Sequence, residues 1–365
     1  MREMEHEGEA PAAAAPGLLR RSYPYLRTLL QLAVAGGLLA GLLLRVDRGA
    51  VREQLEEASL IWLPLAFAGT IVSQWFRAVR WRHLLQPMRR MGVPFLFGAN
   101  LIGASGNIVL PLRAGELIRV QVLRKRSGLT VSSIVATVLT EKLADMVAYS
   151  TFIVLGLLLF DDARFLWPVG VAYAAIVVAG LVAGRHLARR TERAPEAEVA
   201  ADAGRLRRWL RRELHSFGHG LRSFLRPGEM FHVAWSSHAA WLCEATMYYA
   251  FGRAMGLDLS PAVYLLVVVT ATIAVSVPLT QAGLGVFELA IAGLLVAFGV
   301  DESTAAAYAI FSHVFLAIPY LVSGPLAALA LRLNPSDILF MRAGNRGGEE
   351  PLAAEAATPR PASDR

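Results

Sequence analysis

The chain has 365 residues, of which 55% are hydrophobic and only 18% charged, with a mean hydropathy of +0.46. Soluble domains carry about 25% charged residues, so this composition argues against a soluble enzyme and against disorder. The net charge is +7, with 34 arginines against 2 lysines, which in so hydrophobic a chain indicates membrane topology rather than nucleic-acid binding. The single cysteine, Cys243, excludes an internal disulfide and a cysteine-based zinc site.

Apolar runs suited to crossing a membrane recur along the chain, since a spanning helix needs about 20 mostly apolar residues. The uncharged runs are Thr28–Leu44, Ser59–Phe76, Val93–Leu112, Phe165–Gly184, Leu259–Phe287 and Ser303–Leu331. Two further apolar stretches, Val131–Phe160 and Met230–Gly252, contain charged residues. We predict an all-α fold, a polytopic membrane helix bundle with about six full spans and two re-entrant hairpins, eight membrane segments in all. A polar leader occupies 1–25, the transmembrane domain 26–334, and a tail expected to be disordered 335–365.

Arginine clusters predict the orientation of these segments, because cytoplasmic loops are enriched in Lys and Arg. We assign Arg77, Arg80, Arg82, Arg89 and Arg90 to one cytoplasmic connection, and the eleven arginines of an amphipathic basic loop at 185–229 to another. The alternation predicts a cell-membrane protein with cytoplasmic N- and C-termini. Arg124 also falls on the cytoplasmic side. The apolar segment between Arg90 and Arg124 must therefore enter the membrane and return, as a hairpin over 94–122.

An inverted internal repeat is the second organising feature. Pro94 and Pro111 recur as Pro261 and Pro278 at an offset of 167, which defines repeat halves of about 59–160 and 230–331. The first hairpin lies between basic flanks and the second between acidic ones, so the halves have opposite orientation. Inverted repeats with broken helices are typical of transporters, and the breaks mark the binding site.

Charged residues fall near the middle of one predicted span. Glu141, Lys142 and Asp145 lie 10 to 14 residues into a helix that begins near Val131, about 15–21 Å deep. Glu141 and Asp145 share one helix face at spacing i, i+4, and Lys142 lies about 100° round. Charges at that depth are costly and face protein or a cavity. They form either a polar translocation path or a structural ion-pair network with Arg113 or Arg119.

The first hairpin tip carries the sharpest residue-level hypothesis. Arg113 precedes a new helix, and arginine recognises phosphate with bidentate geometry, so Arg113 binds a phosphate headgroup or, alternatively, pairs with Glu141 or Asp145. The candidate substrate-binding residues are Arg113, Glu116, Arg119, Glu141, Lys142, Asp145, Gln281 and Glu288. The candidate structural residues of the hairpins are Asn107, Pro111, Gly115, Pro278, Gly283 and Gly285. Glu244 and His313 add polarity nearby.

Three ordered motifs carry a resemblance to a known family. They are NIVLPLRAGELIR beginning at Asn107, EKLAD beginning at Glu141, and PLTQAGLGVFE beginning at Pro278. The chain resembles the lysylphosphatidylglycerol synthase transmembrane-region family, also called flippase-like membrane proteins, over roughly residues 25–335. In the bifunctional members this region is similar to the half that moves the modified lipid between leaflets. Their large aminoacyl-transferase domain has no counterpart here, so lysyl transfer is not expected.

The functional expectation is a lipid flippase that moves an anionic phospholipid or a polyprenyl or glycolipid between leaflets. The alternatives are a membrane-embedded transferase, with Glu141 or Asp145 as base, and a non-catalytic partner of a separate lipid-modifying enzyme. We expect an anionic membrane lipid as partner, and no nucleic acid, cofactor, metal ion or catalytic residue. The sequence does not determine the oligomeric state or the particular lipid.

Overall fold

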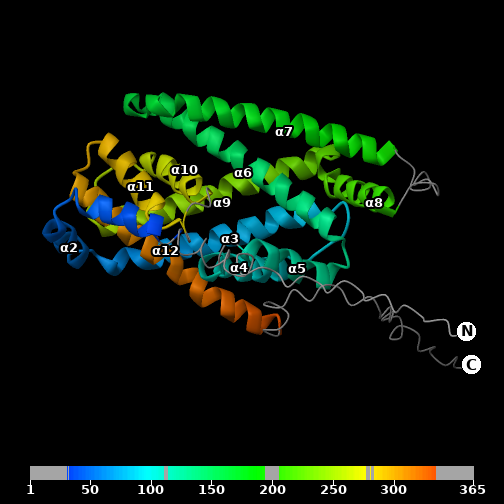
Figure 1. Ribbon diagram of the computed structural model, residues 1–365, viewed down its shortest axis with the longest axis horizontal. Helices are drawn as coiled ribbons and strands as arrows, with labels where there is room; N and C mark the ends of the chain where they lie inside the picture. Colours follow the sequence, from blue (N-terminus) through cyan, green and yellow to red (C-terminus); the bar gives the residue numbers. More distant parts are fainter. Residues whose placement is uncertain are drawn as a thin grey trace, which may run out of the picture.

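The computed structural model describes residues 31, 33–110, 114–193, 205–276, 280 and 283–333, and within these ranges every regular element is a helix. The predicted all-α class is therefore confirmed, while the leader at 1–25 and the tail at 335–365 lie outside the described residues. The helices in chain order are Ala33–Leu43, α2 (Arg48–Glu56), α3 (Leu63–Leu85), α4 (Val93–Val109), α5 (Gly115–Ser127), α6 (Val131–Leu159), α7 (Trp167–Arg193), α8 (Arg205–Gly220), α9 (Pro227–Ala254), α10 (Val263–Ser276), α11 (Val286–Ala297) and α12 (Glu302–Ala330). Figure 1 shows them as one elongated bundle.

The centre of the bundle is the antiparallel pair α3 and α9. Contacts join them in opposite order along their length, Trp62 with Tyr249, Gly69 with Cys243, Phe76 with Trp235 and His83 with His232. Gly69 allows the closest approach, since a Cβ there would lie 2.8 Å from the carbonyl oxygen of Cys243. In a membrane the hydrophobic effect does not drive helices together, because lipid tails are as apolar as the side chains. Small residues at the interface instead let the helices pack closely. Arg77 and Arg80 of α3 and Glu244 of α9 belong to this pair.

Two pairs of short helices lie where the sequence predicted broken membrane segments. In the first pair, Gly103 contacts Arg119 and Gly106 contacts Ile118, so α4 and α5 run antiparallel. With 17 and 13 residues, they are about 25 and 20 Å long, less than the roughly 30 Å of a bilayer core. In the second pair, α10 packs against α11. The tips, with Pro111, Arg113, Pro278 and Gln281, lie outside the described residues.

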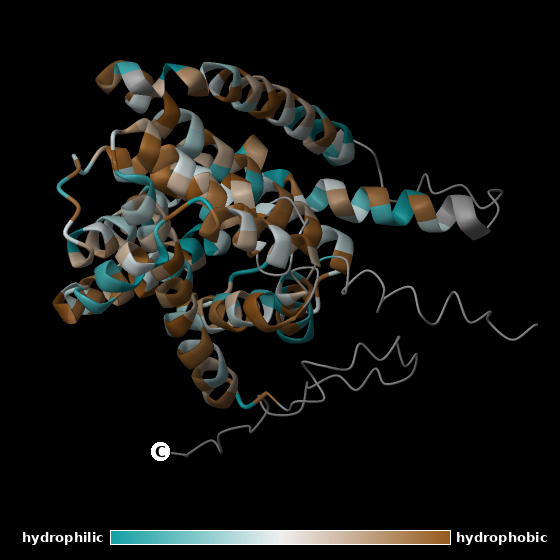
Figure 2. Cartoon of the chain, turned by 60° about the vertical axis from the view of Figure 1, so that its left-hand side comes forward, coloured by the Kyte–Doolittle hydropathy of each residue, from teal (hydrophilic) through white to brown (hydrophobic). Residues whose placement is uncertain are grey.

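Apolar helices face outward as expected of a membrane protein. Figure 2 shows hydrophobic segments extending to the outside of the bundle, and α7 exposes Val171, Ile176, Val178 and Val182. By length and composition, three described helices could each cross a membrane, α6, α7 and α12, and a fourth span results if α2 and α3, bent by 60°, are counted together.

That number is below the six full spans predicted. Part of the first expected span falls outside the described residues. The other missing span is α9, which is 28 residues long. Histidines, serines and Glu244 interrupt its apolar sequence. Their polarity keeps its hydropathy low, although Glu244 itself is buried against other helices.

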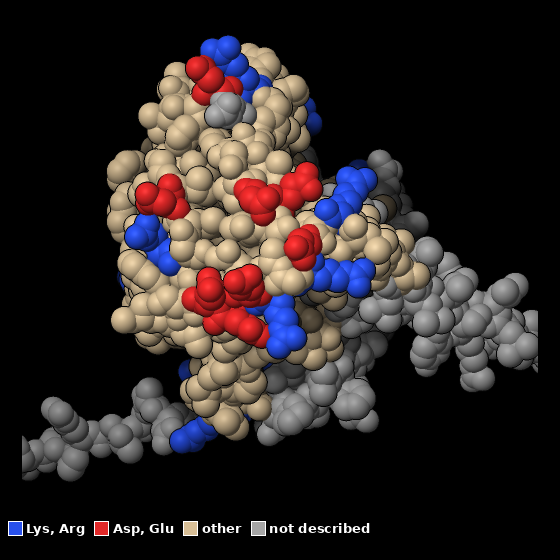
Figure 3. All heavy atoms as spheres, turned by 90° about the vertical axis from the view of Figure 1, so that its left-hand side faces the viewer, with Lys and Arg blue, Asp and Glu red and all other residues tan. Residues whose placement is uncertain are grey.

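The two ends of the bundle differ in charge. Contacts of Asp47 with Ser303, Ser59 with Ala254 and Phe160 with Phe298 bring together the acidic segments at one end. Figure 3 looks onto this end and shows Asp and Glu side chains scattered over it among fewer Lys and Arg. At the other end, His83 contacts Glu229, Arg185 donates to the carbonyl oxygen of Phe224 and Gly98 contacts Leu331, which brings together the ends of α3 and α7, with their arginines, and the end of α12.

The segment at 185–229, predicted as a cytoplasmic amphipathic loop, is largely helical. Its first residues continue α7 as far as Arg193, and α8 packs against α6. Gly220 touches Ser133 of α6, and Ser133 Oγ donates a 2.7 Å hydrogen bond to the carbonyl of Ser216. The amphipathic helix is therefore partly covered by the bundle rather than free on all sides.

Candidate functional site

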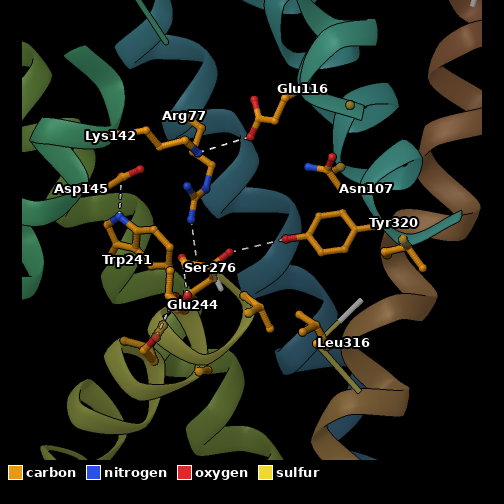
Figure 4. A pocket seen from close by; sticks show the side chains of 18 of the residues that line it. Arg77, Asn107, Glu116, Lys142, Asp145, Trp241, Glu244, Ser276, Leu316 and Tyr320 are labelled. Carbon is orange, nitrogen blue, oxygen red and sulfur yellow. Dashed lines mark hydrogen bonds and ion pairs between the residues drawn. The ribbon is translucent and has the colours of Figure 1, made fainter. Parts of the chain in front are cut away.

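A cavity of about 550 Å³ lies inside the bundle, between the central pair and the two pairs of short helices. Its wall is charged on one side and uncharged, mainly apolar, on the other. The polar side chains include Gln74, Arg77, Asn100, Asn107, Glu116, Arg119, Glu141, Lys142, Asp145, Trp241, Glu244 and Tyr320, together with the hydroxyls of Tyr149, Tyr248, Thr272 and Ser276. The apolar ones include Ile108, Val268, Ala271, Val275, Phe287 and Leu316. Figure 4 shows the charged groups of α3, α6 and α9 on one side, with Leu316 and Tyr320 of α12 opposite. Such a cavity suits an amphiphile with a charged end and a hydrocarbon end.

Arg80 occupies the centre of the charged network, behind the cavity wall. Its guanidinium is fully buried and pairs with Glu141 Oε1 at 2.6 Å and with Asp145 Oδ1 at 2.5 Å. It also donates to Ser237 Oγ of α9 at 3.1 Å. One cation thus holds both carboxylates of α6, and the three charges tie α3 to α6. Removing one member of such a buried network costs about 3–5 kcal/mol, because it leaves an uncompensated charge.

Glu141 and Asp145 lie on one face of α6 and are almost fully buried, in agreement with their i, i+4 spacing. The sequence offered Arg113 or Arg119 as their ion-pair partner. Of these two, Arg119 pairs with Glu141 at 3.2 Å, whereas Arg113 lies outside the described residues. Arg80, the cation that meets both carboxylates, was not anticipated.

The assignment of Arg77 and Arg80 to a cytoplasmic connection was wrong. The uncharged run ends at Phe76, which suggested the end of the span, but α3 continues to Leu85. The helix can continue because carboxylates from α6 and α9 neutralise both arginines inside the bundle. The sequence does carry a signal: Arg77 and Arg80 are spaced i, i+3, so both would lie on one face if the preceding apolar helix continued through them.

Arg119 forms a second cluster in the first turns of α5, close to the tip of the first hairpin. It pairs with Glu116 at 2.9 Å on its own helix and with Glu141 on α6, and it donates to Asn100 Oδ1 of α4 at 3.2 Å. Its guanidinium also lies over the ring of Trp81, 4.6 Å from the centroid. These contacts join the hairpin α4–α5 to the central helices.

Lys142 lies at the exposed edge of that cluster, where it meets Glu116 rather than the buried carboxylates of α6. Its Nζ lies 3.3 Å from Glu116 Oε1, and its side chain is 47% exposed. An ion pair this open contributes little to stability. The ammonium group of Lys142 therefore lies at the edge of the cavity.

Arg77 faces the cavity itself, and the sequence analysis missed its role. Its Nη2 pairs with Glu244 Oε2 at 2.8 Å, and its guanidinium lies 4.1 Å from the ring centroid of Trp241. The indole of Trp241 donates in turn to Asp145 Oδ1 at 2.6 Å. Tyr320 approaches the other oxygen of Glu244 at 3.5 Å (Figure 4). Glu244, which the sequence marked only as a nearby polar residue, is therefore part of the cavity wall.

The second hairpin contributes differently. Glu288 is buried, accepts a 2.7 Å hydrogen bond from the backbone N–H of Gly285 and lies 2.7 Å from His313 Nδ1. It does not appear among the described residues that line the cavity, whereas Gly283 and Phe287 do. Gly283 and Gly285 both have positive φ, 83° and 81°, which explains why glycine occupies these turns.

The structural candidates of the first hairpin lie in its tightest contact. Gly115 packs against Gly103 and Asn107 of α4 so closely that no Cβ fits. Asn107 also reaches the cavity wall. Pro111 and Arg113, which follow it, lie outside the described residues.

Opposite charges balance around the cavity. Among the described residues of the network, the cations are Arg77, Arg80, Arg119 and Lys142, and the anions are Glu116, Glu141, Asp145 and Glu244. Among the described residues, no cluster of three or more His, Cys, Asp or Glu side chains could hold a metal ion. The arrangement is chemically suited to exchanging ion-pair partners with a charged ligand.

The chain belongs to the family described as the lysylphosphatidylglycerol synthase TM region, whose model matches residues 28–324. A curated relative is the glycosyltransferase AglD of Haloferax volcanii, 24% identical over 408 aligned residues that cover 96% of this chain. The chain spans 64% of the length of that relative. Another is a UPF0104 membrane protein of Methanothermobacter thermautotrophicus, 24% identical over 291 residues, which cover 74% of this chain and 85% of the relative. The chain is accordingly an integral membrane protein of this family.

Proposed function

We propose that this protein binds an anionic amphiphilic lipid in the central cavity and moves its headgroup across the membrane. The observation that carries the proposal is the two-sided wall of the cavity. Paired charges line the side formed by α3, α6 and α9, whereas the side formed by α10, α11 and α12 is uncharged and mainly apolar, with Val275, Phe287 and Leu316 beside the hydroxyls of Thr272, Ser276 and Tyr320. A headgroup and its hydrocarbon chain would each find a matching surface.

The charge asymmetry of the bundle supports a specific orientation. The arginine-rich end corresponds to the cytoplasm under the positive-inside rule, and the acidic end to the outside. In that orientation the hairpin α4–α5 enters from the cytoplasm and α10–α11 from the opposite side, as an inverted repeat requires. Their short helices would then meet near the middle of the bilayer, where broken helices form transporter binding sites.

Transport of lipid by the purified full chain tests the proposal. The protein is reconstituted in vesicles that contain fluorescent phosphatidylglycerol, and a membrane-impermeant quencher reports lipid arriving in the outer leaflet. Ala104→Trp fills the cavity from α4, whereas the matched control Ala175→Trp adds the same ring to an exposed position on α7. We expect Ala104→Trp to slow transport by about tenfold or more, equivalent to about 1.4 kcal/mol of added barrier, and Ala175→Trp to leave it unchanged. Absence of transport by the unmodified chain, or equal rates for both variants, would contradict the proposal.

A membrane-embedded transferase is the second candidate, because the Haloferax relative is named a glycosyltransferase. The geometry gives it less support, because Glu141 and Asp145, the residues expected to act as base, are both held by Arg80. Either carboxylate would have to leave this guanidinium before it could act on a substrate, and breaking such a buried pair is costly. Transfer of a labelled sugar to membrane lipid by the purified chain, lost in Asp145→Asn, would favour this candidate over transport.

A further inference from the structure

Two arginines one turn apart on α3 have different surroundings. Arg80 is fully buried and bound to two carboxylates, with Ser237 beside them. Arg77 lies on the cavity wall, where its side chain is 12% exposed, and holds only the carboxylate of Glu244. A ligand in the cavity can therefore reach the guanidinium of Arg77 but not that of Arg80.

The other contacts of Arg77 keep it in place when its carboxylate partner changes. Its guanidinium rests on the ring of Trp241, and its Nε donates to Ser73 Oγ at 3.3 Å on its own helix. Trp241 is fixed by its hydrogen bond to Asp145, which Arg80 neutralises. A phosphodiester that approaches from the cavity thus meets a positioned cation whose fork geometry matches its oxygens.

We propose that Arg77 and Glu244 form an exchangeable ion pair, in which an anionic phosphodiester replaces Glu244 on Arg77 and Glu244 takes up one proton. The inference rests on the lipid-binding cavity of the proposed function and adds a ligand residue and a coupled ion. Each anionic headgroup enters with one proton from the solvent, which binds to the carboxylate oxygen. The charge of the site is the same before and after, because the proton compensates the added anion.

The groups that face Glu244 explain why a proton accompanies the exchange. Arg77 on α3 is its cationic partner, while α6 contributes Asp145 and Tyr149, and α12 contributes Tyr320. On its own helix, the neighbouring titratable groups are Cys243 and Tyr248.

None of these other groups supplies a positive charge when Arg77 is engaged elsewhere. Asp145 is occupied by Arg80 and Trp241, so no second guanidinium becomes free. A bare carboxylate in this enclosed position is disfavoured, whereas a protonated one can donate to Tyr320. The oxygen of Tyr320 lies within reach and already accepts from Gln74 Nε2 at 3.2 Å.

Proton uptake on binding tests the exchange directly. The purified full chain in an uncharged detergent is titrated with dihexanoyl phosphatidylglycerol in weak buffer containing a pH indicator. We expect about one proton to be taken up per lipid bound, and the affinity to fall by up to about tenfold for each unit of rising pH, since the proton is a co-ligand. Binding of this lipid without proton uptake would overturn the inference.

Variants locate the proton. Glu244→Gln should bind the lipid with no proton uptake and no dependence on pH, while Glu56→Gln, in the exposed pair with Arg52, should behave as the unmodified chain. Arg77→Gln should lose binding, and the double variant Arg77→Gln/Glu244→Gln should regain thermal stability without regaining binding. Persistent pH dependence in Glu244→Gln, or full affinity in the double variant, would contradict the assignment.

The source of the anion is distinguished by a second probe. Dimethyl phosphate carries the same single charge without acyl chains. Proton uptake with both probes assigns the site to the phosphodiester itself, and uptake with the lipid alone shows that chain contacts are also required. Uptake with neither overturns the inference. The proposed function is tested separately: vesicles that transport lipid without proton uptake on binding refute only this exchange, and uptake without transport refutes only the lipid transport.

Discussion

The two hairpins have similar architecture and unlike chemistry. The hairpin α4–α5 brings Glu116 and Arg119 into a network with Glu141. The hairpin α10–α11 presents Val275 and Phe287 to the cavity. Its own acid, Glu288, is buried against the Gly285 backbone and His313. The comparison teaches that the two pairs of short helices divide the work: α4–α5 adds charge to the cavity wall, whereas α10–α11 adds uncharged and mainly apolar residues.

That division suits a ligand that is itself divided. A cavity with charge on both sides would offer a hydrocarbon chain no apolar surface. A cavity with apolar residues on both sides would leave a charged headgroup without partners. The charged half must also survive without ligand, which explains why its cations and anions are already paired. The variants below alter one half at a time and ask whether stability and binding follow the division.

The largest effect is expected at the centre of the charged half. Arg80→Gln leaves Glu141 and Asp145 without their shared cation, although Arg119 still contacts Glu141. We expect a loss of about 3–5 kcal/mol, the precedent for breaking a buried ion pair. Thermal unfolding in detergent measures it. An unfolding midpoint equal to that of the unmodified chain would show that Arg80 does not hold the central helices together.

An intermediate effect compares the two hairpins through their glycines. Gly115→Ala pushes a methyl group into Gly103 and Asn107 of α4, so we expect a loss of about 1–3 kcal/mol from overpacking. Gly293→Ala, inside α11, meets no atom within 4 Å and should instead stabilise the helix by about 0.5–1 kcal/mol. Thermal unfolding in detergent measures both changes. Equal shifts of the unfolding midpoint in the same direction would show that the first hairpin is not packed more tightly than the second.

The smallest effect is expected at the exposed edge of the charged half. Lys142→Gln removes the partner of Glu116 across 3.3 Å, in a pair whose lysine is 47% exposed. We expect stability to change by less than about 1 kcal/mol. A midpoint lowered as far as that of Arg80→Gln would mean that Lys142 belongs to the buried network, and the distinction between the two parts of the charged half would fail.

Several features were determined by the sequence alone, because they depend on local pattern. Apolar runs placed the membrane helices, and glycines with proline marked the breaks between α4 and α5. The spacing of Glu141 and Asp145 placed both on one face of α6, as observed. Glycine at 283 and 285 marked turns that the backbone indeed makes with positive φ. These inferences need only the periodicity of a helix and the cost of a charge in lipid.

Only the tertiary structure decided which charges meet. Arg80 pairs with residues 61 and 65 positions further along the chain, and Arg77 with a glutamate 167 positions away. From local sequence alone, Arg77 and Arg80 were interpreted as the end of a span and the start of a cytoplasmic loop. The pattern within α3 gives no sign of the carboxylates that other helices supply. Their burial is tolerable only once α6 and α9 pack against α3 and supply the opposite charge. Ion-pair partnership inside a membrane is a property of packing, and the helices must be assembled before it exists.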